Sequence, residues 1–301
     1  MNSLTLKQLR YFEALARQGH FGRAADICSV SQPALSVQIK DLEATLGAAL
    51  FERGPRHVSL TRFGEDFAKR VRHILQAVDE LGDLARAAQG PLSGKLRLGV
   101  IPTIAPYLLP RVLKRLSDSH QGLDVLVRET ITPRLISELQ AGRLDAAIVA
   151  LPISEPTLVE TPLGREDFVL VRPASHSDPT APTPALLARE RLLLLEEGHC
   201  FRDQALSFCG LPGDARGDAR SDAMDGSSLA TLVQMVSAGL GVTLIPDMAI
   251  PVETRRADVQ VARFASPAPS REIGLVWRRT SPLEAQLSGV ADILRSELAA
   301  D

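Results

Sequence analysis

The chain has 301 residues, of which 45% are hydrophobic and 23% charged. This is the composition of a folded protein of two or three domains, and it excludes disordered and collagen-like classes. Three cysteines are too few for a disulfide framework, and no apolar run approaches the roughly 20 residues of a membrane span. We therefore expect a cytoplasmic protein with no membrane partner. Residues 1–95 carry 13 Lys and Arg against 10 Asp and Glu, so the net charge of this segment is +3 and that of the remaining residues is −5. This weak asymmetry permits nucleic-acid binding by residues 1–95.

The head has the pattern of a helix-turn-helix followed by a wing. Apolar side chains recur at helical spacing, Ser31 can cap the third helix, and Pro33 fits its first turn. Gly54-Pro55 separates two short extended runs, which predicts a hairpin. The expected elements are helices at 4–17, 22–27 and 32–46, and a wing at 50–61. We therefore predict a winged helix-turn-helix DNA-binding domain over residues 1–61.

A long helix without internal proline is expected over residues 62–89. Its apolar residues alternate at steps of four and three, which is typical of a dimerising coiled-coil seam. The alternative is a helix that lies on its own domain. The predicted dimerisation residues are Phe67, Val71, Ile74, Val78, Leu81 and Ala85. Together with the breakers at 89–95, this segment is predicted to be a linker helix and hinge over residues 62–95.

From residue 96 onward, short β-branched runs alternate with amphipathic helices, which predicts α/β lobes with parallel sheets. Strands are expected at 96–101, 123–129, 145–150, 168–173, 192–197, 242–246 and 273–277, with helices near 106–117 and 133–141. The length favours two lobes around a cleft, of the periplasmic-binding-protein-like kind. We assign lobe I to about 96–162 and 269–301, and lobe II to about 163–268.

The third helix offers side chains that can bond to base edges and phosphates, and the wing adds two arginines. The alternative is a solvated polar face. The candidate DNA contacts are Ser31, Gln32, Pro33, Ser36, Gln38, Lys40, Arg53 and Arg56. A two-fold dimer would read double-stranded operator DNA with two related half-sites.

The head resembles LysR-type transcriptional regulators. The resemblance rests on FxxLARQGHFGRAA, SQPALSxQIxxLExxLGxxLFER and LTxxG, which occur in this order, and the α/β remainder resembles the two-lobed effector domain of that family. It implies a bacterial regulator that forms homodimers and homotetramers, with RNA polymerase as a candidate partner and no enzyme activity. Most members of the family bind a small organic effector in the cleft between the lobes.

The stretch GHCFRDQALSFCG at 198–210 points to a different input. Cys200 precedes an expected helix at 201–208, where the helix dipole and the neighbours His199 and Arg202 favour a thiolate. A thiolate attacks peroxide, and the resulting sulfenic acid condenses with a second thiol. Cys209 would lie roughly 13 Å away at about 1.5 Å per helical residue, whereas a disulfide requires less than about 7 Å. A bridge would therefore unwind the helix. Two buried cysteines without a function are the alternative.

Four motifs together are similar to the hydrogen peroxide-sensing members of the LysR family: GHCxRDQAxxFC, IPTxxPYLLP, RETxT and REIGLVWRxxSPL. The resemblance implies that Cys200 is the peroxidatic thiol and Cys209 its resolving partner. It also places five residues around the peroxide, namely Thr103, Thr132, His199, Asp203 and Arg271. For each there is an alternative without chemistry, in which the threonines cap helices, Arg271 pairs with a surface acid and His199 belongs to a turn.

Other chemistries lack their motifs. The six histidines form no HExxH or HxxxH pattern and no CxxC occurs, so we expect no metal and no cofactor. Three functions remain: a regulator switched by peroxide that controls antioxidant genes, a LysR-type regulator with an organic effector, and a thiol peroxidase that carries a DNA-binding head.

Overall fold

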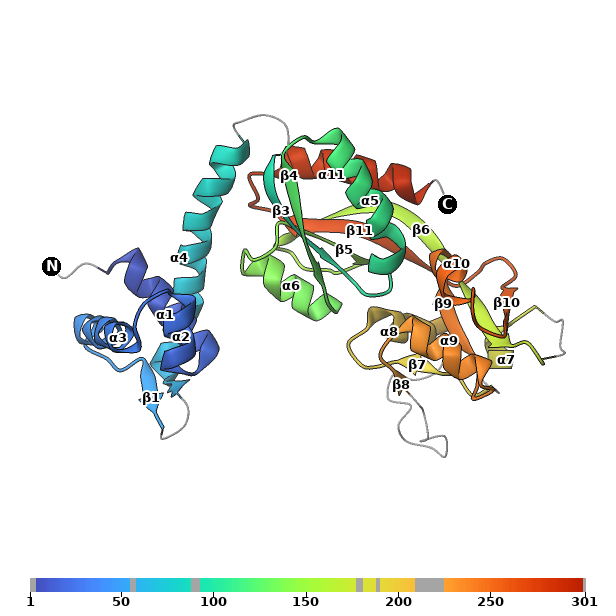
Figure 1. The fold of residues 1–301 in the computed structure, drawn as a ribbon, viewed down its shortest axis with the longest axis horizontal. Coiled ribbons are helices and arrows are strands. Elements are labelled where there is room, and N and C mark those ends of the chain that lie inside the picture. The colour runs from blue at the N-terminus through green and yellow to red at the C-terminus, as the bar shows by residue number, and fades with distance from the viewer. Residues whose placement is uncertain are drawn as a thin grey trace. The chain divides into compact units, whose positions relative to one another are not determined.

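The computed structural model of the chain describes residues 4–54, 58–87, 93–176, 181–187, 190–208 and 225–299. The chain divides into two compact units, residues 1–85 and 86–301 (Figure 1). The first unit is helical with a small hairpin, whereas the second is a mixed α/β structure. This is the fold class that the sequence predicts.

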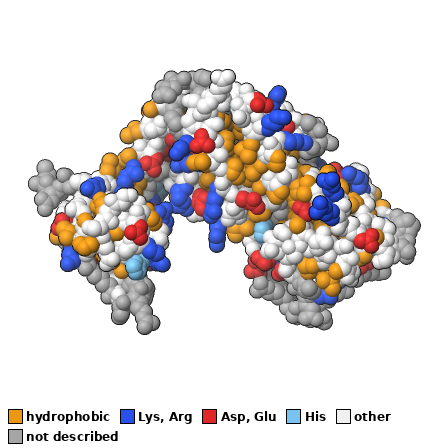
Figure 2. All heavy atoms as spheres, in the orientation of Figure 1, with side chains coloured by type: hydrophobic (Ala, Val, Ile, Leu, Met, Phe, Trp, Pro, Cys, Tyr) orange, Lys and Arg blue, Asp and Glu red, His pale blue; other side chains and the backbone are white. Residues whose placement is uncertain are grey.

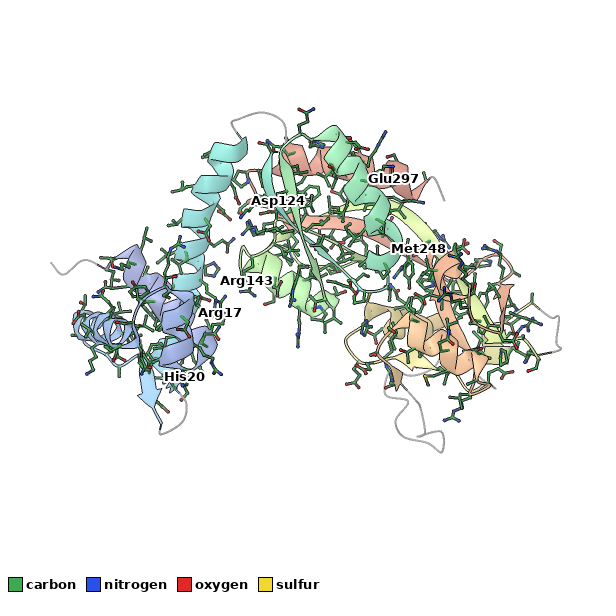
Figure 3. The ribbon with its side chains drawn as sticks, viewed as in Figure 1. Arg17, His20, Asp124, Arg143, Met248 and Glu297 are labelled. Atoms are coloured by element: carbon green, nitrogen blue, oxygen red, sulfur yellow. The ribbon has the colours of Figure 1, made fainter. Side chains whose placement is uncertain are left out.

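The first unit contains the expected helices and wing. Its elements are α1 (Leu6–Gln18), α2 (Phe21–Ile27), α3 (Gln32–Leu46), β1 (Phe51–Arg53), β2 (Val58–Leu60) and α4 (Arg62–Ala87). Ser31 caps α3 by accepting a hydrogen bond from the Ala34 amide, and a proline occupies the first turn. His20 caps α2, accepting from the amides of Gly22 and Arg23, and Figure 3 labels it beside that helix. Local capping thus fixes where both helices of the helix-turn-helix begin.

The wing is fastened to α4 at a point of close backbone approach. Thr61 donates to the Ala49 carbonyl and accepts from the Gly64 amide. A Cβ atom at Gly64 would overlap the carbonyl oxygen of Leu50. Glycine is therefore required where α4 passes the start of the wing.

The apolar seam of α4 is used in two ways. Phe67 and Val71 pack in the core of the head, where the ring of Phe67 meets that of Phe12 at 5.0 Å. Further along, Ile74 and Leu81 are exposed, with 65% of Leu81 accessible. Part of the predicted seam is therefore occupied within its own unit, and the exposed part begins at Ile74. The role of these residues in dimerisation stays a prediction.

The second unit begins with parallel strands alternating with helices, and its later strands pair antiparallel with the earlier ones. Its strands are β3 (Gly94–Val100), β4 (Leu123–Glu129), β5 (Ala146–Leu151), β6 (Leu158–Pro173), β7 (Leu194–Leu195), β8 (Asp225–Gly226), β9 (Thr243–Pro246), β10 (Val259–Arg263) and β11 (Ser270–Arg278). Its helices are α5 (Ala105–Ser119), α6 (Thr132–Gln140), α7 (Pro184–Leu187), α8 (Cys200–Phe208), α9 (Leu229–Ser237), the 3-10 turn η1 (Asp247–Ala249), α10 (Ile250–Glu253) and α11 (Glu284–Leu298).

The sheets are mixed, which differs from the parallel sheets predicted. β3 pairs in parallel with β4 and β5, but β6 and β11 pair antiparallel with each other, and so do β11 with β5 and β6 with β9 and β10. The difference arises because β6 carries the chain out of one lobe and β11 carries it back. These two long strands join the lobes (Figure 1).

Two hydrophobic cores follow one another along β6, and β6 and β11 are called the crossing strands below. The first contains buried side chains from Leu96 to Leu163 and from Ile273 to Leu294, covered by α5, α6 and α11. The second contains side chains from Phe168 to Ala249. Each core buries its own helices and strands, so the two lobes meet chiefly where β6 and β11 pass between them.

Candidate functional site

Cys200 lies in a small pocket between segments from both cores. The lining comes from the end of β3, the start of α6 and the start of α8: Ile101, Pro102, Thr103, Ile131, Thr132, His199, Cys200 and Phe201. The structure therefore brings four of the predicted site residues together: the thiol, both threonines and the histidine.

Cys200 is the first residue of α8 and is partly buried with a free thiol. The helix dipole and the open amides at this end stabilise negative charge. The expected helix after the cysteine is present and continues to Phe208. Cys209 lies outside the described residues, so its pairing with Cys200 stays a prediction.

Neither threonine of the pocket caps a helix. Ile104 and Ile131 hold the cap positions of α5 and α6, and neither makes a side-chain capping bond. The hydroxyl oxygen of Thr132 is buried and has no hydrogen-bond partner among the described residues. A buried hydroxyl without a partner costs free energy, which is tolerated where a ligand supplies the missing bond. Among the described residues, the hydrogen-bonding capacity of the Thr132 hydroxyl is therefore unused.

Arg271 lies behind the pocket wall. Its Nη1 donates to the Thr103 hydroxyl at 2.7 Å and its Nη2 donates to the Thr103 carbonyl at 2.9 Å. Its guanidinium carbon is 5.7 Å from the centre of the Phe201 ring. The arginine is buried, and its carboxylate partner is the equally buried Glu166. The alternative of a surface ion pair is therefore not what the structure contains.

The other ionisable residues near Cys200 have different surroundings. Arg202 donates to the Leu195 carbonyl and to Asp225, both at 2.8 Å. Burial lowers the pKa of His199, and the charge of Glu196 opposes that shift. Asp203 is exposed on α8 and does not line the pocket. The N-terminal end of α8 is therefore the positive group next to the thiol, and Arg271 contacts the pocket lining through Thr103.

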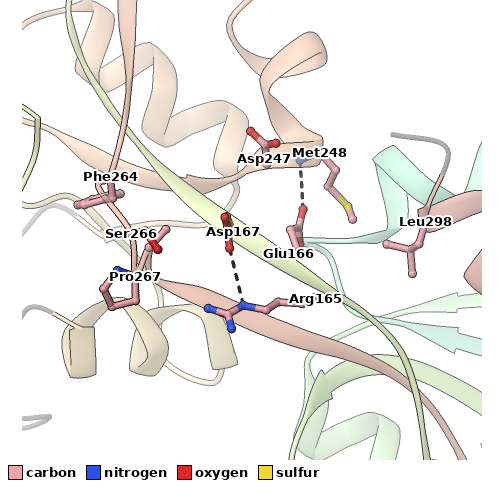
Figure 4. A pocket seen from close by; sticks show the side chains of 10 residues that line it. Arg165, Glu166, Asp167, Asp247, Met248, Phe264, Ser266, Pro267 and Leu298 are labelled. Atoms are coloured by element: carbon pink, nitrogen blue, oxygen red, sulfur yellow. Dashed lines mark hydrogen bonds and ion pairs between the residues drawn. The ribbon is translucent and has the colours of Figure 1, made fainter.

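A larger cavity of about 700 Å³ lies beside the crossing strands. Its wall includes Glu166, Asp167 and Met248, and Figure 4 shows the Glu166 carboxylate bonded to the Met248 amide. Glu166 therefore belongs to this cavity while it also holds Arg271. The guanidinium connects a residue of one cavity with a residue of the other.

Sequence reasoning missed Glu166 and four residues that line the pocket: Ile101, Pro102, Ile131 and Phe201. Phe201 follows the cysteine directly and could have been included on that ground. Glu166 sits in a segment with several other charges, and nothing in its local sequence distinguishes it. Its role depends on the register in which β6 meets β11.

The predicted DNA-contacting residues lie on α3 and the wing. Ser31, Gln32, Pro33 and Lys40 are exposed, whereas Ser36 and Gln38 are partly exposed. The opposite face of α3 is buried in the head through Leu35, Ile39 and Leu42. The side chain of Arg53 and all of Arg56 lie outside the described residues. Figure 2 shows Lys and Arg interspersed with Asp and Glu on the visible face. The DNA contacts of these residues stay a prediction.

The described segments show neither a metal-binding cluster nor a membrane-spanning helix. They contain no group of three or more His, Cys, Asp or Glu side chains placed to hold a metal ion. No helix among them is both long and apolar enough to cross a membrane.

Two protein families match the chain. The bacterial regulatory helix-turn-helix family described as lysR matches residues 6–65, and the LysR substrate binding domain matches residues 89–299. A probable hydrogen peroxide-inducible genes activator of Streptomyces viridosporus is 45% identical over 98% of this chain and 94% of its own. The DNA-binding transcriptional dual regulator OxyR of Escherichia coli is 39% identical over 98% and 96%.

Solved structures show the same similarity. A full-length cysteine-to-aspartate variant of OxyR from Pseudomonas aeruginosa matches with a TM-score of 0.77 and 36% identity, over 98% of this chain and 96% of that one. A hydrogen peroxide-bound cysteine-to-serine mutant of Corynebacterium glutamicum OxyR matches with a TM-score of 0.66 and 36% identity, over 98% and 93%. The similarity therefore extends over both units.

Proposed function

Since the chain belongs to the LysR family of DNA-binding transcription regulators and is OxyR-like, we propose that it senses hydrogen peroxide through Cys200 and signals through a disulfide with Cys209. The observation that carries the proposal is the pocket lined by Cys200, Thr103 and Thr132, in which the buried Thr132 hydroxyl has no hydrogen-bond partner among the described residues. The pocket is too small for an extended organic effector.

The first step is attack of the Cys200 thiolate on one peroxide oxygen. The S–O bond forms as the O–O bond breaks, and the leaving hydroxide takes up the proton that the thiol released, so the products are a sulfenic acid and water. Negative charge develops on the leaving oxygen during this step. In this proposal the hydroxyls of Thr103 and Thr132 donate to that oxygen, and the hydrogen bond from Arg271 polarises the Thr103 hydroxyl.

The second step joins the sulfenic acid to the thiol of Cys209, with release of water. The helix α8 occupies the chain up to Phe208. A helical path from residue 200 to residue 209 spans roughly 13 Å, but a disulfide requires Cα atoms within about 7 Å. The bond therefore forms only if α8 unwinds. Such remodelling is a two-state switch, because the element cannot satisfy both arrangements.

The response to oxidation would be a change in DNA binding by the head. We propose that a cytoplasmic homodimer, assembled further into a tetramer, places two α3 helices on related half-sites of an operator that controls antioxidant genes, with RNA polymerase as a further partner. The exposed apolar residues of α4 from Ile74 onward support a paired arrangement.

The test is peptide mapping of the reduced full-length protein after one equivalent of hydrogen peroxide, with thiols trapped. We expect a Cys200–Cys209 linked peptide that has lost the mass of two hydrogens. The Cys200→Ser variant should bind the operator but lose its response to peroxide. Unreacted thiols would favour an organic effector, and catalytic turnover with a reductant would favour a thiol peroxidase.

A further inference from the structure

The buried ion pair behind the pocket is set by strand register. Glu166 in β6 and Arg271 in β11 are direct partners across the antiparallel pair. Both side chains are withdrawn from solvent, with exposures of 5% and 0%. Since a lone buried guanidinium is costly, the carboxylate is needed for Arg271 to stay at this depth.

Hydrogen bonds to Glu166 and Thr103 fix the orientation of the Arg271 guanidinium. Nε of Arg271 donates to Oε2 of Glu166 at 2.7 Å, and Nη2 is 2.7 Å from the same oxygen. The outer part of the guanidinium then reaches the hydroxyl and the carbonyl of Thr103. Glu166 is itself fixed, because its Oε1 accepts from the Met248 amide at 3.1 Å.

We propose that Glu166 is a positioning residue for the reaction of Cys200 with peroxide, acting through Arg271 and Thr103. The Thr103 oxygen accepts from Arg271, so its own proton remains available for an oxygen atom in the pocket. Without the carboxylate, the guanidinium loses its bonds to Glu166 and is no longer held in this orientation. Thr103 then loses the partner that polarises its hydroxyl. This inference rests on the proposed function.

The carboxylate is required in a specific chemical sense. It accepts hydrogen bonds at both oxygens, from Arg271 on one side and from the Met248 amide on the other. A glutamine of the same shape has only one accepting oxygen, so its amide nitrogen would face one of the two donors. Glu166→Gln therefore keeps the volume but cannot keep both bonds.

The test compares two reactions of the same thiol in the reduced full-length protein. One is oxidation by hydrogen peroxide, followed by rapid quenching and mass analysis. The other is alkylation by iodoacetamide, which needs the thiolate but breaks no O–O bond. In Glu166→Gln we expect the peroxide rate to fall at least tenfold while the alkylation rate stays within twofold of the wild type.

The matched control is Asp167→Asn. Asp167 is the next residue of β6 and also lines the larger cavity, but it is exposed and paired with Arg165. Both of its rates should match those of the wild type. If Glu166→Gln does not fold, Glu166→Asp keeps the charge and draws it back from Arg271, and its peroxide rate should fall at least threefold.

The outcomes separate this inference from the proposed function. A slow peroxide reaction in the wild type would contradict the proposed function itself. A fast wild type together with an equally fast folded Glu166 variant would overturn only the role of Glu166. An equal loss in both the peroxide and alkylation rates would also overturn it, because it would indicate a general disturbance around Cys200.

Discussion

Tyr107 on α5 donates a hydrogen bond of 2.7 Å to the carboxylate of Glu253 on α10. The helix α5 covers the first core, while Tyr107 itself packs against the second. This bond therefore ties the lobes together at a point separate from the crossing strands. Burial first, and the bond to Glu253 second, raise the pKa of Tyr107 above its ordinary value.

Tyr107→Phe should destabilise the second unit by about 1.5–3 kcal/mol at pH 7, the usual contribution of a hydrogen bond to a charged group. The pKa of the phenol is higher in the folded than in the unfolded chain. Its stabilisation is thus complete below the unfolded pKa of about 10 and is lost as the pH rises above that value. Urea unfolding from pH 7 to pH 11 should show the difference between wild type and variant shrinking at the alkaline end. A constant difference across this range would contradict the role of the hydroxyl.

Gly64→Ala should destabilise the head by about 1–3 kcal/mol, because the added Cβ meets a backbone carbonyl that cannot move without shifting the wing. The matched control is Gly82→Ala in the same helix, where the structure places nothing within 4 Å of the new carbon. That substitution should stabilise α4 by about 0.5–1 kcal/mol. Thermal unfolding should show a lower melting temperature for Gly64→Ala and a higher one for Gly82→Ala. Equal changes in both variants would contradict a steric clash at Gly64.

The head was the most predictable part of the chain, because its helix boundaries depend on local signals. Ser31, Pro33 and the breaker after α1 act within a few residues of themselves. The seam of α4 was harder, since apolar spacing does not say which surface covers it. Phe67 and Val71 turned out to face their own head.

The site was predictable only as far as its residue types. A helix at 201–208 was predicted from the residues and α8 begins one residue earlier, whereas the two threonines were predicted only from the family resemblance. The bonds that hold the pocket could not be predicted. Arg271 and Glu166 are 105 residues apart, and they meet because β6 and β11 pair in one particular register. The run at 192–197 was also misleading, since only Leu194–Leu195 forms a strand there. Hydrophobicity indicates burial, but pairing partners are set by the tertiary fold.

Lys40→Ala should weaken operator binding about equally for all sequences and reduce the salt slope by about one, as loss of a phosphate contact does. Gln38→Ala should instead relax the base preference at one position of each half-site, at a cost of about 1–3 kcal/mol. Lys69→Ala on α4 is the control, because Lys69 is exposed, pairs with Asp66 and lies outside α3. Titration of operator DNA at several salt concentrations separates the three variants. An unchanged slope in Lys40→Ala would exclude a phosphate contact there.

Thr132→Val should make the protein more stable and less reactive at the same time. The hydroxyl is buried without a described partner, so its removal should raise the free energy of unfolding by about 1 kcal/mol. If it donates to the leaving oxygen of the peroxide, the same removal should slow oxidation of Cys200 on the order of 10- to 100-fold.

Thr243→Val provides the opposite case in the same unit. The Thr243 hydroxyl is buried as well, but it donates to the Leu193 carbonyl at 2.8 Å. Its loss should therefore lower stability by about 1–3 kcal/mol, and it should leave the peroxide rate unchanged because Thr243 does not line the pocket. Denaturant unfolding and quenched oxidation kinetics test both variants. If Thr132→Val is destabilised like Thr243→Val, its hydroxyl has a structural partner and is not held open for a ligand.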